Sequence, residues 1–334
     1  MTPAVPIPDL ARRTLELVDV PSESREERAL VDLVRGLVPG SPVYDDGEVL
    51  LFGTGRVVLA GHLDTVPAQG NVPGRIEDGA VHGLGASDMK GGIAVMVELA
   101  RAGVPARYLF FTREEVPVTE SPLPALFATR LLADAELAVV LEPTDCELHA
   151  GCLGNLQARV TFHGESAHSA RPWTGVNAIN ELVRGLESLA ASEPRDVEVD
   201  GLVFREVVTA VRLEGGIAAN VVPASASVEL NMRYLETGAA DRLRALVPDG
   251  ELEILGDSPS APPSLETARL RRLRELVPVV KPKQAWTPVA QFAEHGIAAI
   301  NYGPGATAYA HRRDELIPVE NLERCYATLR EFLS

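Results

Sequence analysis

Short apolar runs recur along the chain, and they predict buried β-strands that finish in polar residues. Residues 57–60 form an uninterrupted apolar run, which is typical of a strand covered on both faces. His62 and Asp64 follow this run directly, and Asp88 comes after a loop rich in Pro and Gly. Residues 93–102 then carry apolar side chains at helical spacing. This order of strand, loop and helix indicates an α/β domain.

Three further strand-like runs end in the same way. Residues 107–111 lead to Glu114 and Glu115, residues 137–141 lead to Glu142, and residues 297–301 precede His311. If these strands are parallel neighbours, their polar residues meet His62 and Asp88 at one edge of an open sheet, where ligands bind. Histidine and carboxylate side chains without paired cysteines suit zinc or a similar divalent ion. One of the acids is then left over as a base.

The hydrophobic pattern changes after residue 154. Residues 156–162 alternate between apolar and polar, which predicts a half-exposed strand. A helix (175–191), two strands (207–213 and 228–234), a second helix (239–247) and a last strand (251–255) are predicted to follow. This β-α-β-β-α-β order is ferredoxin-like. We therefore predict an α/β protein with a mixed, mostly parallel sheet and flanking helices over residues 1–154 and 261–334, and an inserted α+β lid and dimerisation domain over 155–260.

Two signals concern the helices around this framework. Amphipathic spacing predicts helices over residues 9–18, 265–277 and 319–333. Ser24 and Glu27 have the spacing of a capping box, which predicts that the Ser24 hydroxyl accepts a hydrogen bond from the Glu27 amide. The helix that this box begins should carry an apolar face as far as Leu37 and end near Pro39 and Gly40.

Charge and cysteine content narrow the possible partners. The 334 residues include 31 Lys and Arg against 47 Asp and Glu, a net charge of −16, and no basic patch stands out. Nucleic acid and anionic membranes are therefore disfavoured as partners. Cys146, Cys152 and Cys325 are sparse, odd in number and form no CxxC pair, so we expect no disulfide framework and a cytoplasmic protein. Residues 1–14 lack the pattern of a signal peptide, and no apolar run could span a bilayer.

A nucleotide-binding alternative fails on spacing. Gly83 and Gly85 could begin a dinucleotide-binding loop, but its third glycine would fall on Asp88. A redox or nucleotide-binding enzyme is therefore disfavoured.

Several residue strings resemble those of one enzyme family. HLDTVP, GASDMKGG, the Glu114–Glu115 pair, LEPT and a histidine near the C-terminus resemble the di-zinc metallohydrolases related to carboxypeptidase G, aminoacylase and acetylornithine deacetylase. AGCLGNLQARV, ESAHSARPWTGVNAI and GGIAANVVP are most similar to the actinobacterial succinyl-diaminopimelate desuccinylases. The resemblance implies a cytoplasmic, zinc-dependent amide hydrolase of lysine biosynthesis that releases succinate from N-succinyl-L,L-diaminopimelate. A sibling deacylase acting on acetylornithine, a dipeptidase, and a metal-free binding protein on the same fold remain the alternatives.

The resemblance also implies a site with two divalent ions, zinc or else cobalt or manganese. The implied metal ligands are His62, Asp88, Glu115, Glu142 and His311. Asp88 would bridge the two ions, with His62 and Glu142 on one and Glu115 and His311 on the other. Glu114 would be the general base, and Asp64 would orient His62. The peptide bond between Asp88 and Met89 is expected to be cis.

Further residues are implied in substrate recognition. In related enzymes the histidine that matches His168 reaches the partner subunit's site and donates to the substrate carbonyl, which implies a homodimer. Asn220 and Arg233 resemble residues that hold the substrate, and Arg171 and Thr307 are candidates for contacts to its carboxylates.

The chain departs from the family in two places, and the first is residues 111–113, which replace a commoner acid-containing segment before Glu114. Pro288 and Gln291 stand where relatives usually carry Asp and Arg. A contact to the substrate, or one behind the metal ligands, is therefore in question, whereas the proposed ligands and base are all present.

Overall fold

The computed structural model describes residues 9–334. Residues 1–8, part of the stretch considered above for a signal peptide, lie outside the described residues. The chain forms two compact units. The first runs to Gly151 and resumes over Pro263–Lys283 and Thr287–Ser334, and the second comprises Cys152–Pro262 and Gln284–Trp286. The second unit is thus largely an insertion in the first.

An eight-stranded mixed sheet forms the centre of the first unit. Its strands, in spatial order, are β1 (Tyr44–Asp45), β2 (Val49–Phe52), β6 (Arg107–Phe111), β3 (Val57–His62), β7 (Leu137–Val140), β15 (Ala299–Asn301), β8 (Leu148–Ala150) and β14 (Val280–Pro282). β6, β3, β7 and β15 are parallel neighbours, as their sequence pattern predicts. β2 and β8 join this group in antiparallel fashion. The expected α/β architecture is confirmed, and four carboxyl strand ends lie along one edge.

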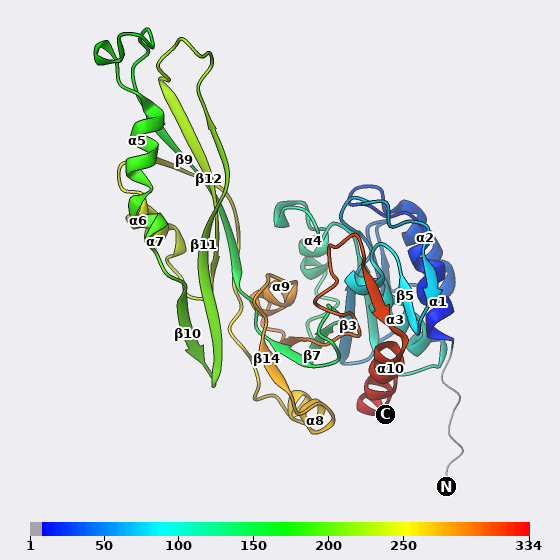
Figure 1. Ribbon diagram of the computed structural model, residues 1–334. Coiled ribbons are helices and arrows are strands. Elements are labelled where there is room, and N and C mark those ends of the chain that lie inside the picture. Colours follow the sequence, from blue (N-terminus) through cyan, green and yellow to red (C-terminus); the bar gives the residue numbers. More distant parts are fainter. Residues whose placement is uncertain (1–8) are drawn as a thin grey trace. The chain divides into compact units, whose positions relative to one another are not determined.

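Helices cover both faces of this sheet (Figure 1). They are α1 (Leu10–Val18), α2 (Arg28–Leu37), α3 (Gly91–Arg101), α4 (Leu123–Ala128), α8 (Ala268–Leu276), α9 (Val289–Glu294) and α10 (Val319–Leu333). α3 packs on β3, and α1 and α10 pack against α3, whereas α9 packs on β7 and β15. A Cβ at Gly92 would lie 2.8 Å from the Leu141 carbonyl oxygen, so only glycine lets α3 begin this close to the strand ends.

A small second sheet holds the segment before α10. Its strands are β16 (Leu316–Pro318), β5 (Ala80–His82) and β4 (Arg75–Glu77). β16 pairs with β5, so the segment after His311 lies beside the segment that leads to Asp88.

The predicted capping box is wrong. α2 begins at Arg28, after Glu27, and no side chain caps it. The Ser24 hydroxyl instead donates to Asp64 Oδ2 at 2.8 Å, and the Glu27 carboxylate accepts from the Arg25 amide at 2.8 Å. The Ser24 hydroxyl therefore binds Asp64, a residue distant in sequence, and does not cap the helix as the local spacing predicts.

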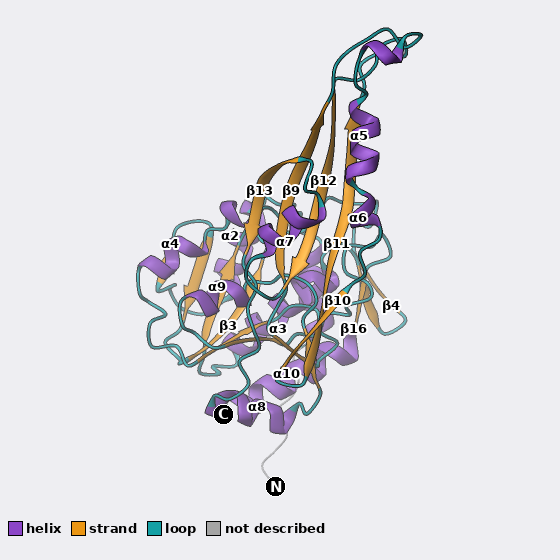
Figure 2. Cartoon of the chain, turned by 90° about the vertical axis from the view of Figure 1, so that its left-hand side faces the viewer, coloured by secondary structure: helices purple, strands orange, loops and turns teal. Residues whose placement is uncertain are grey.

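The second unit is an antiparallel five-stranded sheet with helices on one face (Figure 2). In spatial order its strands are β10 (Arg195–Val199), β11 (Leu202–Gly215), β12 (Ser225–Tyr234), β9 (Gly154–His163) and β13 (Glu251–Ser258), and its helices are α5 (Ala178–Gly185), α6 (Glu187–Ala190) and α7 (Ala239–Leu246). Without β10 this is the ferredoxin-like order. The predicted helix 175–191 begins later, after an Asn177 cap, and divides at Leu186. β10, whose charged alternation hides its strand character, was not predicted.

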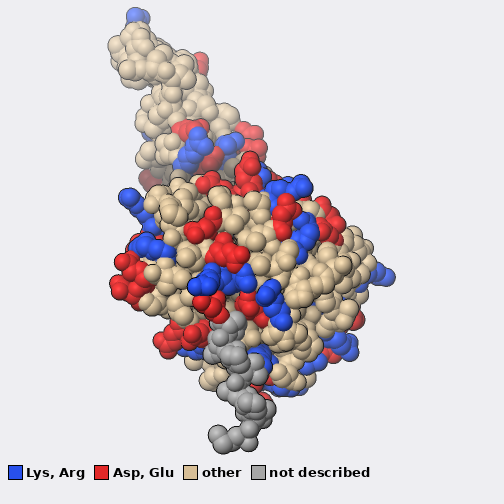
Figure 3. Space-filling model, turned by 90° about the vertical axis from the view of Figure 1, so that its right-hand side faces the viewer, with Lys and Arg blue, Asp and Glu red and all other residues tan. Residues whose placement is uncertain are grey.

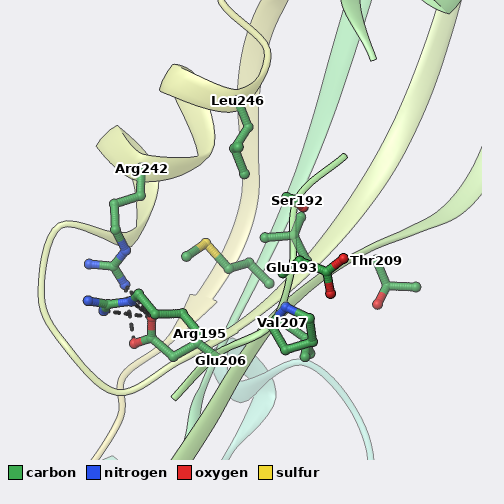
Figure 4. Close-up of a pocket in the computed structure, with 11 residues that line it drawn as sticks. Ser192, Glu193, Arg195, Glu206, Val207, Thr209, Arg242 and Leu246 are labelled. Atoms are coloured by element: carbon green, nitrogen blue, oxygen red, sulfur yellow. Dashed lines mark hydrogen bonds and ion pairs between the residues drawn. The ribbon is translucent and has the colours of Figure 1, made fainter. Parts of the chain in front are cut away.

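A buried carboxylate stabilises this unit beside a pocket (Figure 4). Glu206 on β11 is 4 % exposed and accepts from the amide of Leu235 at 2.7 Å and from that of Glu236 at 3.2 Å. Arg195 lies 2.7 Å and Arg242 3.4 Å from its oxygens. Burial opposes ionisation, but these donors hold the pKa of Glu206 below its usual value. The carboxylate therefore joins β10, β11 and the start of α7.

Glu206→Ala is expected to weaken the second unit. The buried Leu235 amide and the partly buried Glu236 amide lose their acceptor and Arg242 loses its ion pair, so we expect local opening to become easier by about 2 kcal/mol. Hydrogen exchange at the Leu235 and Glu236 amides should then accelerate by roughly 30-fold. The matched control is Glu198→Ala, an exposed acid on β10, and equal exchange rates in both variants would contradict the assigned role.

The surface charge and the helix lengths of the described residues bear on possible membrane contact. Lys and Arg alternate with Asp and Glu over the face drawn in Figure 3. Among residues 9–334, no helix has the length and apolar character needed to cross a bilayer.

Candidate metal centre

Asp88 lies at the centre of the group that forms at the sheet edge. It follows the left-handed Gly85 in the short helical turn Ala86–Lys90, directly before α3. Its Oδ1 is 3.1 Å from His62 Nε2, and its Oδ2 is 3.3 Å from His311 Nε2. The carboxylate therefore lies between two imidazoles, each facing a different oxygen.

Glu142 and Glu115 complete the two sides. Glu142 Oε1 is 3.8 Å from His62 Nε2, and Glu115 Oε1 is 2.8 Å from His311 Nε2. Ligand atoms of His62, Asp88 and Glu115 all lie within 4.8 Å of one another. The structure thus brings together all five residues that the sequence nominates as metal ligands.

The donor set fits a divalent cation. Glu142 Oε1 is buried and has no hydrogen-bond donor, which is costly for a carboxylate oxygen unless a cation compensates it. Lys283 Nζ is 3.8 Å from the other oxygen, Oε2, and so leaves Oε1 open. The group offers two imidazole nitrogens and several carboxylate oxygens, and it contains no thiolate. Zinc, cobalt and manganese all accept such a set of ligands.

The charges of the group are unbalanced. Burial first, and then Glu142, raise the pKa of Glu114 well above its ordinary value. Burial and Asp88 raise the pKa of Glu142 to about 7. Hydrogen bonds to Asp88 and Glu115 raise the pKa of His311 to about 11. Several carboxylates compete here for too little positive charge, which bound cations would supply.

Asp64 fixes the surroundings of His62. Its side chain is fully buried and accepts from the amide of Glu114 at 2.9 Å and from that of Glu115 at 3.0 Å. Its Oδ1 is 3.5 Å from His62 Nδ1, and its own carbonyl oxygen is 3.0 Å from the same nitrogen. Asp64 therefore holds both the imidazole and the start of the acidic pair.

Glu315 is a part of the site that the sequence analysis missed. It is 2 % exposed, and its carboxylate accepts from the amides of Gly85, Ser87 and Asp88 at 2.8, 2.9 and 3.0 Å. The only sequence signal for Glu315 was its position four residues after His311, and this spacing does not distinguish it from a surface charge.

The peptide bond between Asp88 and Met89 is cis, as expected.

Glu315→Ala is expected to loosen the segment that carries Asp88. Three buried amides lose their acceptor, so the free energy of unfolding should fall by about 3 kcal/mol or more, with Glu315→Gln intermediate. Urea unfolding in the presence of a chelator measures this independently of metal. The neighbouring exposed Asp314→Ala is the control, and a Glu315→Ala protein as stable as this control would refute the role.

The residues implied in substrate recognition do not form one cluster within their unit. His168 and Asn220 lie on adjacent loops of the second unit, where the Ser169 amide donates to the Asn220 carbonyl at 3.0 Å. Arg233 lies near the other end of β12, eight residues and roughly 25 Å from Ser225. Its Nε donates to Asn231 Oδ1 at 3.1 Å.

Arg171 and Thr307 have different settings. Arg171 lies in the second unit directly before the exposed turn Pro172–Thr174. Thr307 belongs to the first unit, where its amide donates to Asp145 Oδ2 at 3.1 Å and its hydroxyl contacts the same oxygen. The Thr307 hydroxyl is therefore already paired.

Two of the residues that depart from the family pattern lie at α9. Pro288 precedes this helix, and Gln291 within it is 5 % exposed. Gln291 Nε2 donates to Ser121 Oγ at 3.1 Å. Gln291 thus has a structural partner within the first unit.

Comparison with known proteins gives the family. The model of peptidase family M20/M25/M40 matches residues 58–334, which include every proposed ligand. The chain belongs to this family. M20 enzymes are metallohydrolases of amide bonds, and the expected enzyme class is confirmed.

Individual members of the M20 family agree with this assignment. A Mycobacterium tuberculosis protein provisionally named succinyl-diaminopimelate desuccinylase is 39 % identical, over 96 % of both chains. The Corynebacterium glutamicum succinyl-diaminopimelate desuccinylase is 35 % identical, over 96 % of this chain and 95 % of its own. The crystal structure of aminopeptidase PepT from Bacillus cereus has a TM-score of 0.77 at 20 % identity and covers 97 % of both chains, which shows a shared fold.

Proposed function

We propose that this chain is a succinyl-diaminopimelate desuccinylase that hydrolyses N-succinyl-L,L-diaminopimelate to succinate and L,L-diaminopimelate. The observation that carries the proposal is the convergence of two histidines and three carboxylates at the sheet edge, with Glu114 beside them. The proposed substrate is supported by the near full-length likeness to the Corynebacterium glutamicum desuccinylase and to the Mycobacterium tuberculosis protein provisionally given the same name.

The five converging residues are the proposed ligands of two divalent ions, most simply zinc. His62 and Glu142 would hold one ion and Glu115 and His311 the other, with an Asp88 oxygen for each. When bound, such ions polarise the scissile carbonyl and lower the pKa of water. Asp64 keeps the His62 imidazole in its orientation, since both its carboxylate and its carbonyl face Nδ1.

Glu114 is the proposed general base. Its amide is held by Asp64, and its carboxylate interacts electrostatically with Glu142, His62, Glu115 and Asp88. It would accept a proton from the attacking water and deliver it to the leaving amine. A carboxylate whose pKa is raised by its surroundings is suited to both transfers, because it holds the proton between the two steps.

Residues of the second unit are proposed to complete substrate recognition in a homodimer. By resemblance, His168 would donate to the carbonyl oxygen of a substrate bound in the partner subunit. Asn220 and Arg233 would hold the substrate, with Arg171 and Thr307 toward its carboxylates. Because the chain has a net charge of −16, these arginines would supply the local positive charge that an anionic substrate needs.

The second unit offers an edge for dimerisation. β10 covers β11 only over residues 202–206, and the rest of β11 has no strand on that side within the described residues. Val211 and Leu213 on this stretch are 60 % and 59 % exposed. An uncovered apolar edge strand is a template for pairing with a second copy.

Leu213→Lys places a charge on this edge and should therefore produce monomers in sedimentation. Fully active wild-type monomers would remove the role of His168 in the partner subunit.

The deciding experiment compares three substrates with zinc-loaded protein: N-succinyl-L,L-diaminopimelate, N-acetylornithine and a dipeptide. We expect strong preference for the first in kcat/KM. Activity on another substrate alone would retain the amide hydrolase and reject the desuccinylase. The absence of hydrolysis and of bound metal after reconstitution would reject both.

Deacetylation is the second candidate. The Xanthomonas campestris N-acetyl-L-citrulline deacetylase is 29 % identical over 98 % of this chain and 99 % of its own. Gln291, which replaces a usual arginine, is the feature that favours a substrate with different charge. Preference for N-acetylornithine in the same comparison would support this candidate.

A further inference from the structure

Two cysteines far apart in sequence meet in the first unit. Cys146 lies in the loop after β7, four residues beyond Glu142, and Cys325 lies in the middle of α10. Arg324, which directly precedes Cys325, donates from Nη2 to the carbonyl oxygen of Asp145 at 2.9 Å, directly before Cys146. Cys146 Sγ also donates to the carbonyl oxygen of Asn321 at 3.2 Å, one helical turn before Cys325. The loop and the helix are therefore joined through these side chains.

The two thiols are chemically unequal. Cys146 is 6 % exposed and Cys325 is fully buried. The neighbouring Cys325 thiol, and then Arg324, lower the pKa of Cys146 against the effect of burial. Burial raises the pKa of Cys325 well above its usual value. A thiolate-prone cysteine near a guanidinium, within one helical turn of a second buried thiol, is the arrangement of a redox-sensitive pair.

We infer that Cys146 and Cys325 form a peroxide-sensitive pair that closes into a reversible disulfide and thereby lowers the turnover of the enzyme. The Cys146 thiolate attacks one oxygen of hydrogen peroxide, the O–O bond breaks and hydroxide leaves, giving a sulfenic acid. The Cys325 sulfur then attacks that sulfur, the S–O bond breaks, and the oxygen leaves as water. In sum, two thiols and one peroxide give one disulfide and two waters. A small dithiol reverses the change by exchange.

The loop of Cys146 connects this chemistry to the metal centre. Thr144 Oγ1 donates to the Gly303 carbonyl at 3.1 Å, and the Cys146 amide donates to the same carbonyl at 3.0 Å. The Asp145 amide donates to the Gly305 carbonyl at 2.9 Å. Both cysteines are free thiols, so a disulfide needs their sulfurs to move to covalent distance, and Cys325 is fixed within α10. The loop must therefore shift, and it begins at the proposed ligand Glu142.

The first test measures the bond itself on the full chain. Hydrogen peroxide should lower the count of thiols, taken after denaturation, from three per chain to one. Digestion with trypsin and a glutamyl endopeptidase separates Cys146 from Cys152 at Glu147, so peptide mass identifies the partner of Cys325. A Cys152→Ser protein is the matched control and should still form the bond. A link through Cys152, or no link, would overturn the proposal.

The second test measures the consequence. Activity on whichever amide substrate the wild type hydrolyses should fall by about tenfold or more on oxidation, because small displacements at an oriented site are costly, and dithiothreitol should restore it. Cys146→Ser and Cys325→Ser should each abolish this loss. Arg324→Gln should slow oxidation several-fold without changing its endpoint. Unchanged activity with the disulfide formed would refute the switch.

This inference rests on the proposed hydrolase only for its activity measurement. The thiol count and the peptide map need no substrate. A wrong substrate assignment therefore leaves the first test intact, and a failed first test leaves the proposed function intact.

Discussion

Glu114→Gln is expected to lower kcat by about 10²–10⁴-fold while the metal content stays at its wild-type value. The amide side chain keeps the size of the carboxylate but cannot take a proton from water. The Glu114 backbone amide that pairs with Asp64 is unaffected. Turnover should be measured under saturating substrate, with metal analysis of the same sample.

The adjacent residue provides a matched control. Glu115→Gln removes a proposed ligand that lies 2.8 Å from His311 Nε2, so it should lower both metal content and activity. The pair of variants thus separates proton transfer from metal binding at neighbouring positions. Near-normal turnover by Glu114→Gln, or metal loss equal to that of Glu115→Gln, would reject Glu114 as the base.

Asp88→Asn is expected to disable the centre as a whole. Its carboxylate faces both imidazoles, at 3.1 Å from His62 Nε2 and 3.3 Å from His311 Nε2. With one charge and one ligand oxygen lost, metal content should fall below the wild-type level. kcat/KM should drop by more than roughly 100-fold, which is the upper end of the loss when a residue that hydrogen-bonds to a metal ligand is changed. Equilibrium dialysis with zinc and parallel assays would measure both effects.

The control for this variant is a carboxylate away from any cluster. Asp249→Asn makes the same Asp-to-Asn change at an exposed residue. This variant should bind metal and hydrolyse substrate as the wild type does. If Asp88→Asn retained the wild-type metal stoichiometry and affinity, the bridging assignment would be wrong.

The strand framework of the first unit was largely predictable because its signals are local. Uninterrupted apolar runs mark β3, β6 and β7, and the acids and histidine after each run follow from where such strands end. The family resemblance added the assignment of individual ligands and the cis bond at Asp88. β8 and β14 escaped prediction because each has three residues and pairs only with distant segments.

The errors arose where a distant partner decides the local structure. Ser24 had the spacing of a cap but donates to Asp64, which becomes a neighbour only after folding. Glu315 reads as a surface charge, yet it is buried under the amides that precede and include Asp88. Lys283 near Glu142 escaped notice for the same reason. Sequence periodicity reports which side of an element is apolar, and it does not report which polar groups meet across elements.

The strand order has a consequence for how the chain is made. β15 lies between β7 and β8, so the central sheet cannot be completed during translation until residue 301 has emerged. Residues 152–262 of the second unit are contiguous and are synthesised earlier. Because domains fold as units in the order of their emergence, we expect the inserted unit to fold on the ribosome first. The sheet of the first unit stays incomplete until β15 has been synthesised. His311 emerges last among the proposed ligands, so the metal centre is assembled only when synthesis is nearly finished.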